Sequence, residues 1–222
     1  MEFENVVLNQ DCMTGMKQFP DGFFDLAIVD PVYGDVRQGG YMKNTNSTAR
    51  KARAIEYNNA LWSQNKTPPE YFAELFRVSK NQVIWGGNYF VESIHRDSQG
   101  WIVWDKKHPP GIDFADCELA WTSFDRATRI FRYRWNGMLQ EDMKNKEKRI
   151  HPTQKPVDLY EWILNNYAKP GDKILDTHVG SGSSRIAAYN LGFDFVGFEI
   201  DKGYYDAQEK RFKNHTAQLR LF

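Results

Sequence analysis

Asp30, Pro31 and Tyr33 are the first residues whose types and spacing suggest chemistry. They follow the apolar run "FFDLAIV", which is typical of a buried strand, so they stand where that strand leaves the core. A turn that closes the strand would explain Asp-Pro for purely local reasons. The alternative is a site in which the carboxylate and the proline carbonyl accept hydrogen bonds, while the tyrosine ring stacks on a flat ligand.

A glycine turn near the C-terminus is the second candidate site. The stretch "DKILDTHVGSGSSRIAA" places Gly180, Ser181 and Gly182 between an expected strand and an expected helix. Such small residues let the backbone approach a ligand closely, and the helix N-terminus supplies free amides. The next strand ends on Glu199, where a carboxylate can accept hydrogen bonds from ribose hydroxyls. A plain strand–helix turn remains the alternative, but the acid favours a nucleoside ligand.

The residues around this turn also indicate which nucleoside fits. A dinucleotide fingerprint has a third glycine, where this chain has Arg185. Asp176 precedes the turn, and an acid there suits a ligand with a cationic amino-acid end better than a pyrophosphate. S-adenosylmethionine satisfies both conditions, with Glu199 facing the ribose and Asp176 facing the amino group.

The elements that position these residues alternate between strands and helices. Period-2 and continuous apolar runs predict strands, and helical spacing of apolar residues predicts helices between them, from Pro69 onward and after Pro156. We therefore expect an α/β fold: a Rossmann-like, mostly parallel sheet with an antiparallel edge and helices on both faces. The runs "CELAWTSF" and "TRIFRYRW" are expected to pair with each other in antiparallel fashion.

Composition excludes several function classes. The 222 residues include 29 basic and 29 acidic ones, a balance that argues against a wholly electrostatic nucleic-acid binder. Cys12 and Cys117 have no metal-ligand spacing, so we expect no metal and a reducing, cytoplasmic setting. The chain start does not read as a signal peptide, and no apolar run reaches the length of a membrane span.

Three motifs together resemble a known family. "DPVYG", "HPTQKP" at His151–Pro156 and "DTHVGSGSS" are similar, in this order, to motifs of the β group of DNA amino-methyltransferases. The resemblance runs through nearly the whole chain, and the blocks "ELFRVSKNQVIWGGNYF" and "LAWTSF" look like those of small phage or prophage DNA methylases. It implies one methyltransferase domain over residues 1–222 that methylates adenine N6 or cytosine N4 of DNA. Asp rather than Ser at position 30 favours adenine.

The resemblance also implies roles for individual residues. The catalytic group would be Asp30, Pro31, Val32 and Tyr33 within residues 28–34, and residues 151–205 would form the cofactor half. Asp11, with Cys12 beside it, would approach the cofactor's adenine, and Thr153 and Lys155 would face its methionine carboxylate. The implied cofactor-binding residues are Asp11, Cys12, Thr153, Lys155, Asp176, His178, Gly180, Ser181, Gly182, Ser183 and Glu199.

Two positions depart from the family pattern. The catalytic tetrapeptide is usually Asp-Pro-Pro-Tyr, and this chain has Val32 in its third position. That position mainly shapes the turn, so we expect activity to survive the change. The cofactor motif usually begins Asp-Pro-Phe, where this chain has His178 in the third position. His178 would either stack beside the cofactor or simply fill the turn.

Two basic segments are the expected contacts to DNA. Residues about 34–59 have the composition of a long mobile loop, and residues about 137–150 are a candidate target-recognition segment. Both are short, which predicts a short recognition site or relaxed specificity. The expected phosphate contacts are Arg37, Arg50, Lys51, Arg53, Lys144, Lys146, Lys148 and Arg149. The oligomeric state is left open, with a homodimer as one alternative.

Other functions compete with adenine-N6 methylation. Cytosine-N4 methylation would use the same motifs. A nicotinamide-dependent oxidoreductase would use the glycine turn but would leave "DPVYG" and "HPTQKP" without a purpose. A nucleic-acid-binding module with an inactive pocket is favoured only by Val32 and His178.

Overall fold

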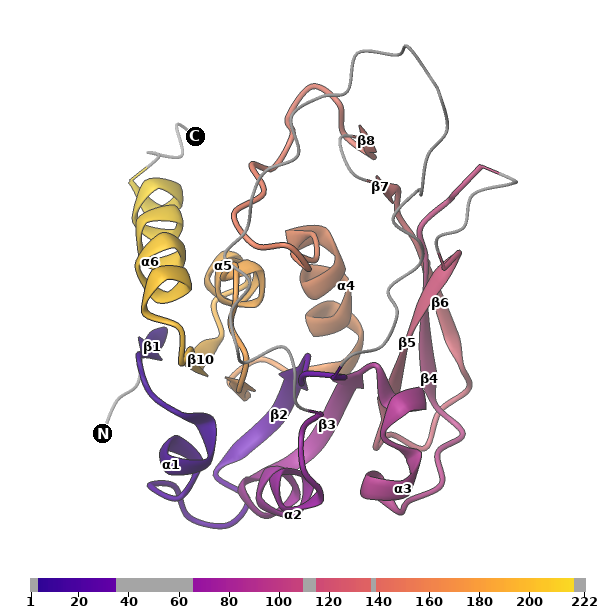
Figure 1. The fold of residues 1–222 in the computed structure, drawn as a ribbon, viewed down its shortest axis with the longest axis vertical. Helices are drawn as coiled ribbons and strands as arrows, with labels where there is room; N and C mark the ends of the chain where they lie inside the picture. Colours follow the sequence, from indigo (N-terminus) through magenta and orange to yellow (C-terminus); the bar gives the residue numbers. More distant parts are fainter. Residues whose placement is uncertain (1–3, 35–65, 110–114, 137–138, 218–222) are drawn as a thin grey trace.

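The computed structural model describes residues 4–34, 66–109, 115–136 and 139–217. These residues form an eight-stranded sheet in the order β1-β10-β9-β2-β3-β5-β4-β6, and helices cover both of its faces (Figure 1). The strands are β1 (Val6–Leu8), β2 (Phe24–Val29), β3 (Ser79–Trp85), β4 (Trp101–Asp105), β5 (Cys117–Thr122), β6 (Arg129–Arg132), β9 (Lys173–Asp176) and β10 (Asp194–Phe198). Two short strands, β7 (Trp135–Asn136) and β8 (Leu139–Gln140), pair separately.

The helices divide between the two faces of this sheet. Figure 1 shows α4, α5 and α6 on one side and α1, α2 and α3 on the other. Their bounds are α1 (Cys12–Met16), α2 (Pro69–Val78), α3 (Val91–Ile94), α4 (Val157–Tyr167), α5 (Ser183–Asn190) and α6 (Lys202–Thr216), with a 3-10 turn at Gly87–Tyr89. The predicted fold class, with a mostly parallel sheet and helices on both faces, is confirmed.

Strand β2 shows why a continuous apolar run folds as a central strand. Successive side chains point to opposite faces of a sheet. Leu26 and Ile28 accordingly belong to the core beneath α4, whereas Ala27 and Val29 belong to the core beneath α1 and α2. Both faces are buried, so an alternating polar pattern would have left polar groups without water.

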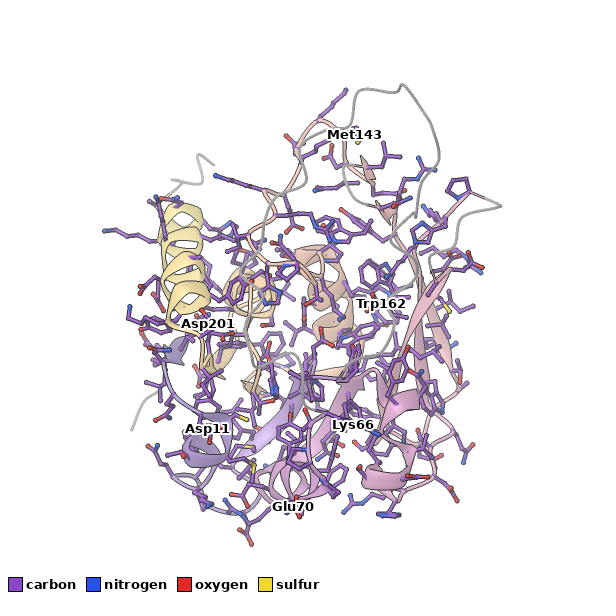
Figure 2. The ribbon with its side chains drawn as sticks, viewed as in Figure 1. Asp11, Lys66, Glu70, Met143, Trp162 and Asp201 are labelled. Atoms are coloured by element: carbon purple, nitrogen blue, oxygen red, sulfur yellow. The ribbon has the colours of Figure 1, made fainter. Side chains whose placement is uncertain are left out.

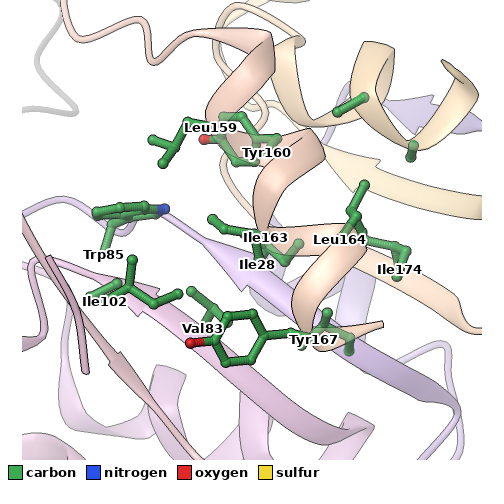
Figure 3. Packing of buried hydrophobic residues seen from close by; sticks show 14 of the residues in the cluster. Ile28, Val83, Trp85, Ile102, Leu159, Tyr160, Ile163, Leu164, Tyr167 and Ile174 are labelled. Atoms are coloured by element: carbon green, nitrogen blue, oxygen red, sulfur yellow. The ribbon is translucent and has the colours of Figure 1, made fainter. Parts of the chain in front are cut away.

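Helix α4 covers the face on which the candidate site is built. Its buried residues recur at helical spacing and include Ile163 and Leu164, both almost without exposed surface. In Figure 3 these two side chains lie against Ile28 of β2 and Ile174 of β9. The helix therefore packs against two neighbouring strands that lie far apart in the sequence.

The antiparallel part of the sheet differs from the expected pairing. β5 does not pair with β6. It lies between β3 and β4 and is antiparallel to both, and β6 pairs with β4 in parallel. The connection from β3 to β4 contains α3, and β4 runs parallel to β3 with one strand position between them. β5 then turns back from β4 into that position, so the antiparallel strand is inside the sheet and not at its outermost edge.

No helix within the described ranges has both the length and the apolar character needed to cross a membrane. Most of the basic loop expected over residues about 34–59 lies outside the described residues.

Replacement of Ile163 by Ala should cost about 2–5 kcal/mol of unfolding free energy, because it leaves a cavity between α4 and the sheet. Urea unfolding followed by circular dichroism measures this change. The matched control is Ile130→Ala on β6, where the side chain is 47% exposed, and its cost should stay within about 1 kcal/mol. Equal losses for the two variants would contradict the packing described for α4.

Candidate active site

The candidate site lies where the strand order reverses. From β9 the chain continues through α5 to β10, and from β2 it continues through α2 to β3, in opposite directions along the sheet. β2 and β9 are parallel neighbours, with Leu26 opposite Ile174 and Ala27 opposite Leu175. Ligands of open α/β sheets bind in the crevice at the carboxyl ends of such a strand pair. Asp30 directly follows β2 and Asp176 ends β9, so both predicted motifs meet at this crevice.

The Asp30 carboxylate is held through both of its oxygens. Its Oδ2 accepts a hydrogen bond from the Lys155 ammonium at 2.5 Å, and its Oδ1 accepts one from the Tyr33 hydroxyl. The side chain of Lys155 is only 4% exposed and that of Asp30 is 18% exposed, so little water screens this pair. The "DPVYG" and "HPTQKP" motifs, 125 residues apart in the chain, are therefore joined by a direct ion pair.

The resemblance implied that Lys155 faces a cofactor carboxylate, and the structure shows which carboxylates of the protein itself surround this lysine. Its ammonium contacts Asp30 and, at 3.1 Å, Oε2 of Glu118. It also lies 5.2 Å from the centre of the Trp85 ring, a cation–π contact. Glu118 in turn pairs through Oε1 with Lys106 at 2.5 Å. Sequence reasoning missed both Glu118 and Lys106.

The Tyr33 ring packs against Gly86, where the lack of a side chain leaves space for the ring. It stacks on Tyr89 with 5.1 Å between ring centres and meets Phe90 edge-on. Gly86 directly follows β3 and precedes the 3-10 turn, with φ +65°, and a Cβ there would lie 2.1 Å from the Tyr33 ring. Only glycine meets both conditions at this position.

Val32 holds the turn through its backbone. Its carbonyl accepts hydrogen bonds from the Thr67 amide at 2.9 Å and from the Thr67 hydroxyl at 3.1 Å. The neighbouring Gly34 lies close to the backbone of Lys66, since a Cβ on that glycine would approach it to 3.1 Å. Residues 34 and 66 therefore lie next to each other, beside Asp30.

The glycine turn between β9 and α5 has the predicted geometry. Gly180 and Gly182 have φ of +52° and +77°, a region that side chains rarely adopt. The Gly180 amide donates to Oε2 of Glu199 at 2.8 Å, which ties this turn to the end of β10. The buried hydroxyls of Ser181 and Ser183 lie 3.1 Å apart within the same turn.

Asp176 is the buried acid of the site, with 2% of its surface exposed. It accepts hydrogen bonds from the Ser184 hydroxyl at 2.5 Å and from the His178 amide at 2.9 Å. Burial raises the pKa of Asp176 to about 7, and the nearby carboxylates of Asp30 and Glu199 add to the rise. This carboxyl group therefore changes charge near neutral pH.

His178 is fixed inside the turn by its neighbours. Its Nδ1 lies 2.9 Å from the Thr177 hydroxyl, and its ring meets Tyr71 of α2 edge-on at 5.5 Å. The Tyr71 hydroxyl also lies 2.5 Å from that of Thr177. Burial lowers the pKa of His178 to about 4, so the ring is neutral at physiological pH.

The predicted cofactor residue Thr153 contacts His151 of the same motif, which was not among the predicted cofactor residues. His151 is buried beside Tyr204 and lies under Gly180, and the Thr153 hydroxyl is 3.1 Å from its Nδ1. The predicted cofactor residue Asp11 lies three residues after β1, which ends at Leu8. Asp11 is the N-cap of α1 and accepts hydrogen bonds from the amide and hydroxyl of Thr14. Figure 2 shows Asp11 and Asp201, the N-cap of α6, on the same side of the molecule.

Cys12 follows Asp11 as a half-buried thiol, and burial, with the Asp11 charge, raises the pKa of this thiol to about 12.

The basic segment around residues 139–149 is anchored by an acid. Glu147 accepts hydrogen bonds from the Val157 amide at 2.8 Å and from Arg211 of α6 at 2.5 Å, and its backbone pairs with the Gln140 side chain. Lys144, Lys146 and Lys148 are exposed, Arg149 is half-buried, and Met143 lies at the far end of the molecule from Glu70 (Figure 2). The other predicted DNA contacts, Arg37, Arg50, Lys51 and Arg53, fall outside the described residues.

Comparison with known proteins confirms the resemblance to DNA methyltransferases. The family model described as DNA methylase matches residues 84–210. The type II methyltransferase M.HinfI of Haemophilus influenzae is 24% identical over 248 residues, which cover 96% of this chain and 69% of the relative. The type II methyltransferase M2.MboI of Moraxella bovis is 22% identical over 247 residues, which cover 95% of this chain and 88% of the relative.

Solved structures of similar fold agree with these relatives. The M1.HpyAVI-SAM complex superposes with a TM-score of 0.57 at 22% identity, covering 92% of this chain and 98% of that one. The cytosine-N4-specific PvuII DNA methyltransferase superposes with a TM-score of 0.61 at 12% identity, covering 95% and 89%. At these identities the structural matches establish the fold.

Replacement of Asp176 by Asn should stabilise the ligand-free protein at high pH. The pKa of Asp176 is about 7 in the folded protein and 3.8 as its ordinary value, so the folded state favours the protonated acid. The resulting contribution to the free energy of unfolding is fully present below pH 3.8 and is lost as the pH rises through about 7. Asn cannot ionise, so its advantage over Asp should grow between pH 4.5 and pH 8, by at most about 1.4 kcal/mol per pH unit. Urea unfolding at both pH values measures it, with the exposed Asp21→Asn as control. A pH-independent difference would contradict the shift.

Proposed function

This chain belongs to the DNA methylase family, and we propose that it transfers the methyl group of S-adenosylmethionine to the N6 amino group of adenine in DNA. The observation that carries this proposal is the position of the Asp30 carboxylate. It lies at the carboxyl end of β2, beside the glycine turn that follows β9, at the crevice between these two strands. A hydrogen-bond acceptor for an amine and a binding turn for a nucleoside thus share one site.

The residues of the turn fit S-adenosylmethionine, the ligand of the M1.HpyAVI complex. Asp176 and Glu199 supply two carboxylates, suited to an ammonium group and to ribose hydroxyls, and the amides of the turn precede α5. The charge of Asp176 depends on pH near 7, so a cationic group beside it would favour its ionised form. When bound, S-adenosylmethionine supplies a methyl group activated by the positive charge on its sulfur.

Asp30 is proposed to act on the attacking nitrogen. The lone pair of an exocyclic amine is delocalised into the base, which makes the amine a poor nucleophile. A carboxylate that accepts a hydrogen bond from this amine draws the nitrogen toward a tetrahedral geometry and stabilises the positive charge that develops on it. The ion pair with Lys155 fixes the carboxylate before the base arrives, so no reorganisation is needed during the reaction.

Tyr33 is proposed to exchange partners when the base enters. Its hydroxyl donates a hydrogen bond to Oδ1 of Asp30, whereas Lys155 donates to Oδ2. An amino group that binds Oδ1 takes the place of this hydroxyl. The target base must leave the duplex to reach the site, and the Tyr33 ring, together with Tyr89, provides an aromatic surface on which it stacks.

Cytosine N4 is the second candidate substrate, because its amino group presents the same chemistry to Asp30. Asp rather than Ser at position 30 supports adenine. The exposed Lys144, Lys146 and Lys148 are proposed to contact DNA phosphates, which would make binding weaken steeply with salt.

Replacement of Asp30 by Asn should lower the methyl-transfer turnover by about 100-fold to 1,000-fold, because a neutral amide is a weaker acceptor for the amine. The assay follows labelled methyl transfer to DNA, and mass spectrometry of the digested nucleosides identifies N6-methyladenine or N4-methylcytosine. S-adenosylmethionine affinity, measured by calorimetry, should change little. Asp21→Asn, on an 83% exposed side chain, is the control and should match the wild type. Wild-type protein that methylates no DNA would refute the proposal, and N4-methylcytosine as the product would correct the base.

Two replacements at Tyr33 should separate stacking from hydrogen bonding. Tyr33→Ala removes the ring and should raise the KM for DNA by the equivalent of about 1–3 kcal/mol of stacking. Tyr33→Phe keeps the ring and removes the hydroxyl that competes for Asp30, so its KM for DNA should not rise. Steady-state kinetics at fixed S-adenosylmethionine measures both. Equal losses for the two variants would show that the hydroxyl, and not the ring, binds the base.

A further inference from the structure

Glu118 reaches the candidate site because β5 runs against its neighbours. Parallel strands bring their last residues to the carboxyl edge of the sheet, whereas an antiparallel strand brings its first residues there. Glu118 is the second residue of β5 and lies opposite Trp104, next to the end of β4. It therefore stands at the same edge as Asp30 after β2.

Four side chains of alternating charge form a chain at this edge. Lys106 contacts Glu118 at 2.5 Å, Glu118 contacts Lys155 at 3.1 Å, and Lys155 contacts Asp30 at 2.5 Å. Their side chains are 18%, 29%, 4% and 18% exposed in the order Lys106, Glu118, Lys155 and Asp30. At this burial, the loss of one charge alters the balance of forces on the next, because water screens the remaining charges only weakly.

The Lys155 ammonium is shared between two carboxylates. Burial alone would lower the pKa of Lys155, but the negative charges of Asp30 and Glu118 raise it. Burial alone would likewise raise the pKa of Glu118, and Lys155 and Lys106 hold it at about 2. Lys155 and Glu118 therefore both stay charged over the physiological pH range. The Lys155 ammonium is attracted by Glu118 and by Asp30 at the same time, so the two carboxylates compete for it.

We propose that Glu118 is a positioning residue that acts on Asp30 through Lys155. By taking a share of the ammonium, Glu118 limits how strongly Lys155 binds Asp30. The carboxylate stays oriented through Oδ2 while Oδ1 remains a strong acceptor for the base amine. This role rests on the proposed function, in which Asp30 accepts a hydrogen bond from the amine.

Glu118→Gln keeps the size of the side chain and removes its charge. Lys155 should then bind Asp30 more tightly and weaken it as an acceptor. The single-turnover rate of methyl transfer should fall by roughly tenfold, as when a residue that supports a reactive group is lost. S-adenosylmethionine affinity and the KM for DNA should not change, because the proposed role of Glu118 is exerted on Asp30 through Lys155 and assigns it no contact with either ligand. Glu74→Gln is the matched control, since Glu74 pairs with Arg77 on α2, is 15% exposed and lies outside the site.

A second measurement follows Asp30 directly and does not depend on activity. In protein labelled with ¹³C at aspartate carboxyl groups, the Asp30 signal is assigned by its loss in Asp30→Asn. The chemical shift of this signal should change in Glu118→Gln and stay the same in Glu74→Gln. In protein that also carries Lys155→Met, Glu118→Gln should no longer change it. Lys106→Met removes the ammonium that contacts Glu118 and lies 5.1 Å from the centre of the Trp104 ring. This change strengthens the hold of Glu118 on Lys155 and should move the signal in the opposite direction.

The outcomes distinguish this inference from the proposed function. A wild-type rate together with an unmoved Asp30 signal in Glu118→Gln would overturn the role of Glu118. A fall in S-adenosylmethionine affinity as large as the fall in rate would also overturn it, because Glu118 would then serve the cofactor. If wild-type protein methylates no DNA, the proposed function fails, and the Asp30 signal still decides whether Glu118 acts on Asp30. If Glu118→Gln does not fold, the Lys106→Met signal decides the same question.

Discussion

The parallel pairing of β2 with β9 is the constraint on which the rest of the site depends. These strands lie far apart in the chain, and their register places Leu26 opposite Ile174 and Ala27 opposite Leu175. A shift of one residue would turn the side chains of β2 to the opposite faces, exchanging those beneath α4 with those beneath α2. Burial on both faces therefore fixes the register, and the register fixes where Asp30 stands relative to the glycine turn. The crevice exists because the connecting helices leave this strand pair in opposite directions.

Burial acts in the same direction on two acids of the site, but their pKa values shift in opposite directions because their neighbours differ. Asp176 has a hydroxyl and an amide as partners and other carboxylates nearby, so its pKa rises to about 7. Glu118 has two ammonium groups as partners, so its pKa falls to about 2. The first carboxyl group can respond to a cationic ligand, whereas the second is a permanent charge that organises the lysine beside it.

The sequence predicted those parts of the fold and site that depend on local patterns. A continuous apolar run identified β2, and apolar residues at helical spacing identified α4. The small residues between β9 and α5 identified a turn, in which Gly180 and Gly182 have positive φ. The partner of Lys155 could not be predicted, because it depends on contacts across more than a hundred residues. Glu118 was hidden for a different reason. A single carboxylate in the apolar run "CELAW" indicates a residue with a special role. Whether it reaches the site depends on the direction and neighbours of β5, and the prediction that β5 pairs with β6 was wrong.

Val32 shows how one departure from a family motif is accommodated. Position 32 meets its structural requirement through the backbone, since its carbonyl accepts two hydrogen bonds from Thr67. Proline and valine both offer this carbonyl, and neither hydrogen bond uses the amide that proline lacks. The turn is held on its other side by the contact of Gly34 with Lys66, and the Tyr33 ring is held by the space at Gly86. The side chain at position 32 is therefore free to vary, while Asp30 and Tyr33 keep their geometry because of residues outside the motif.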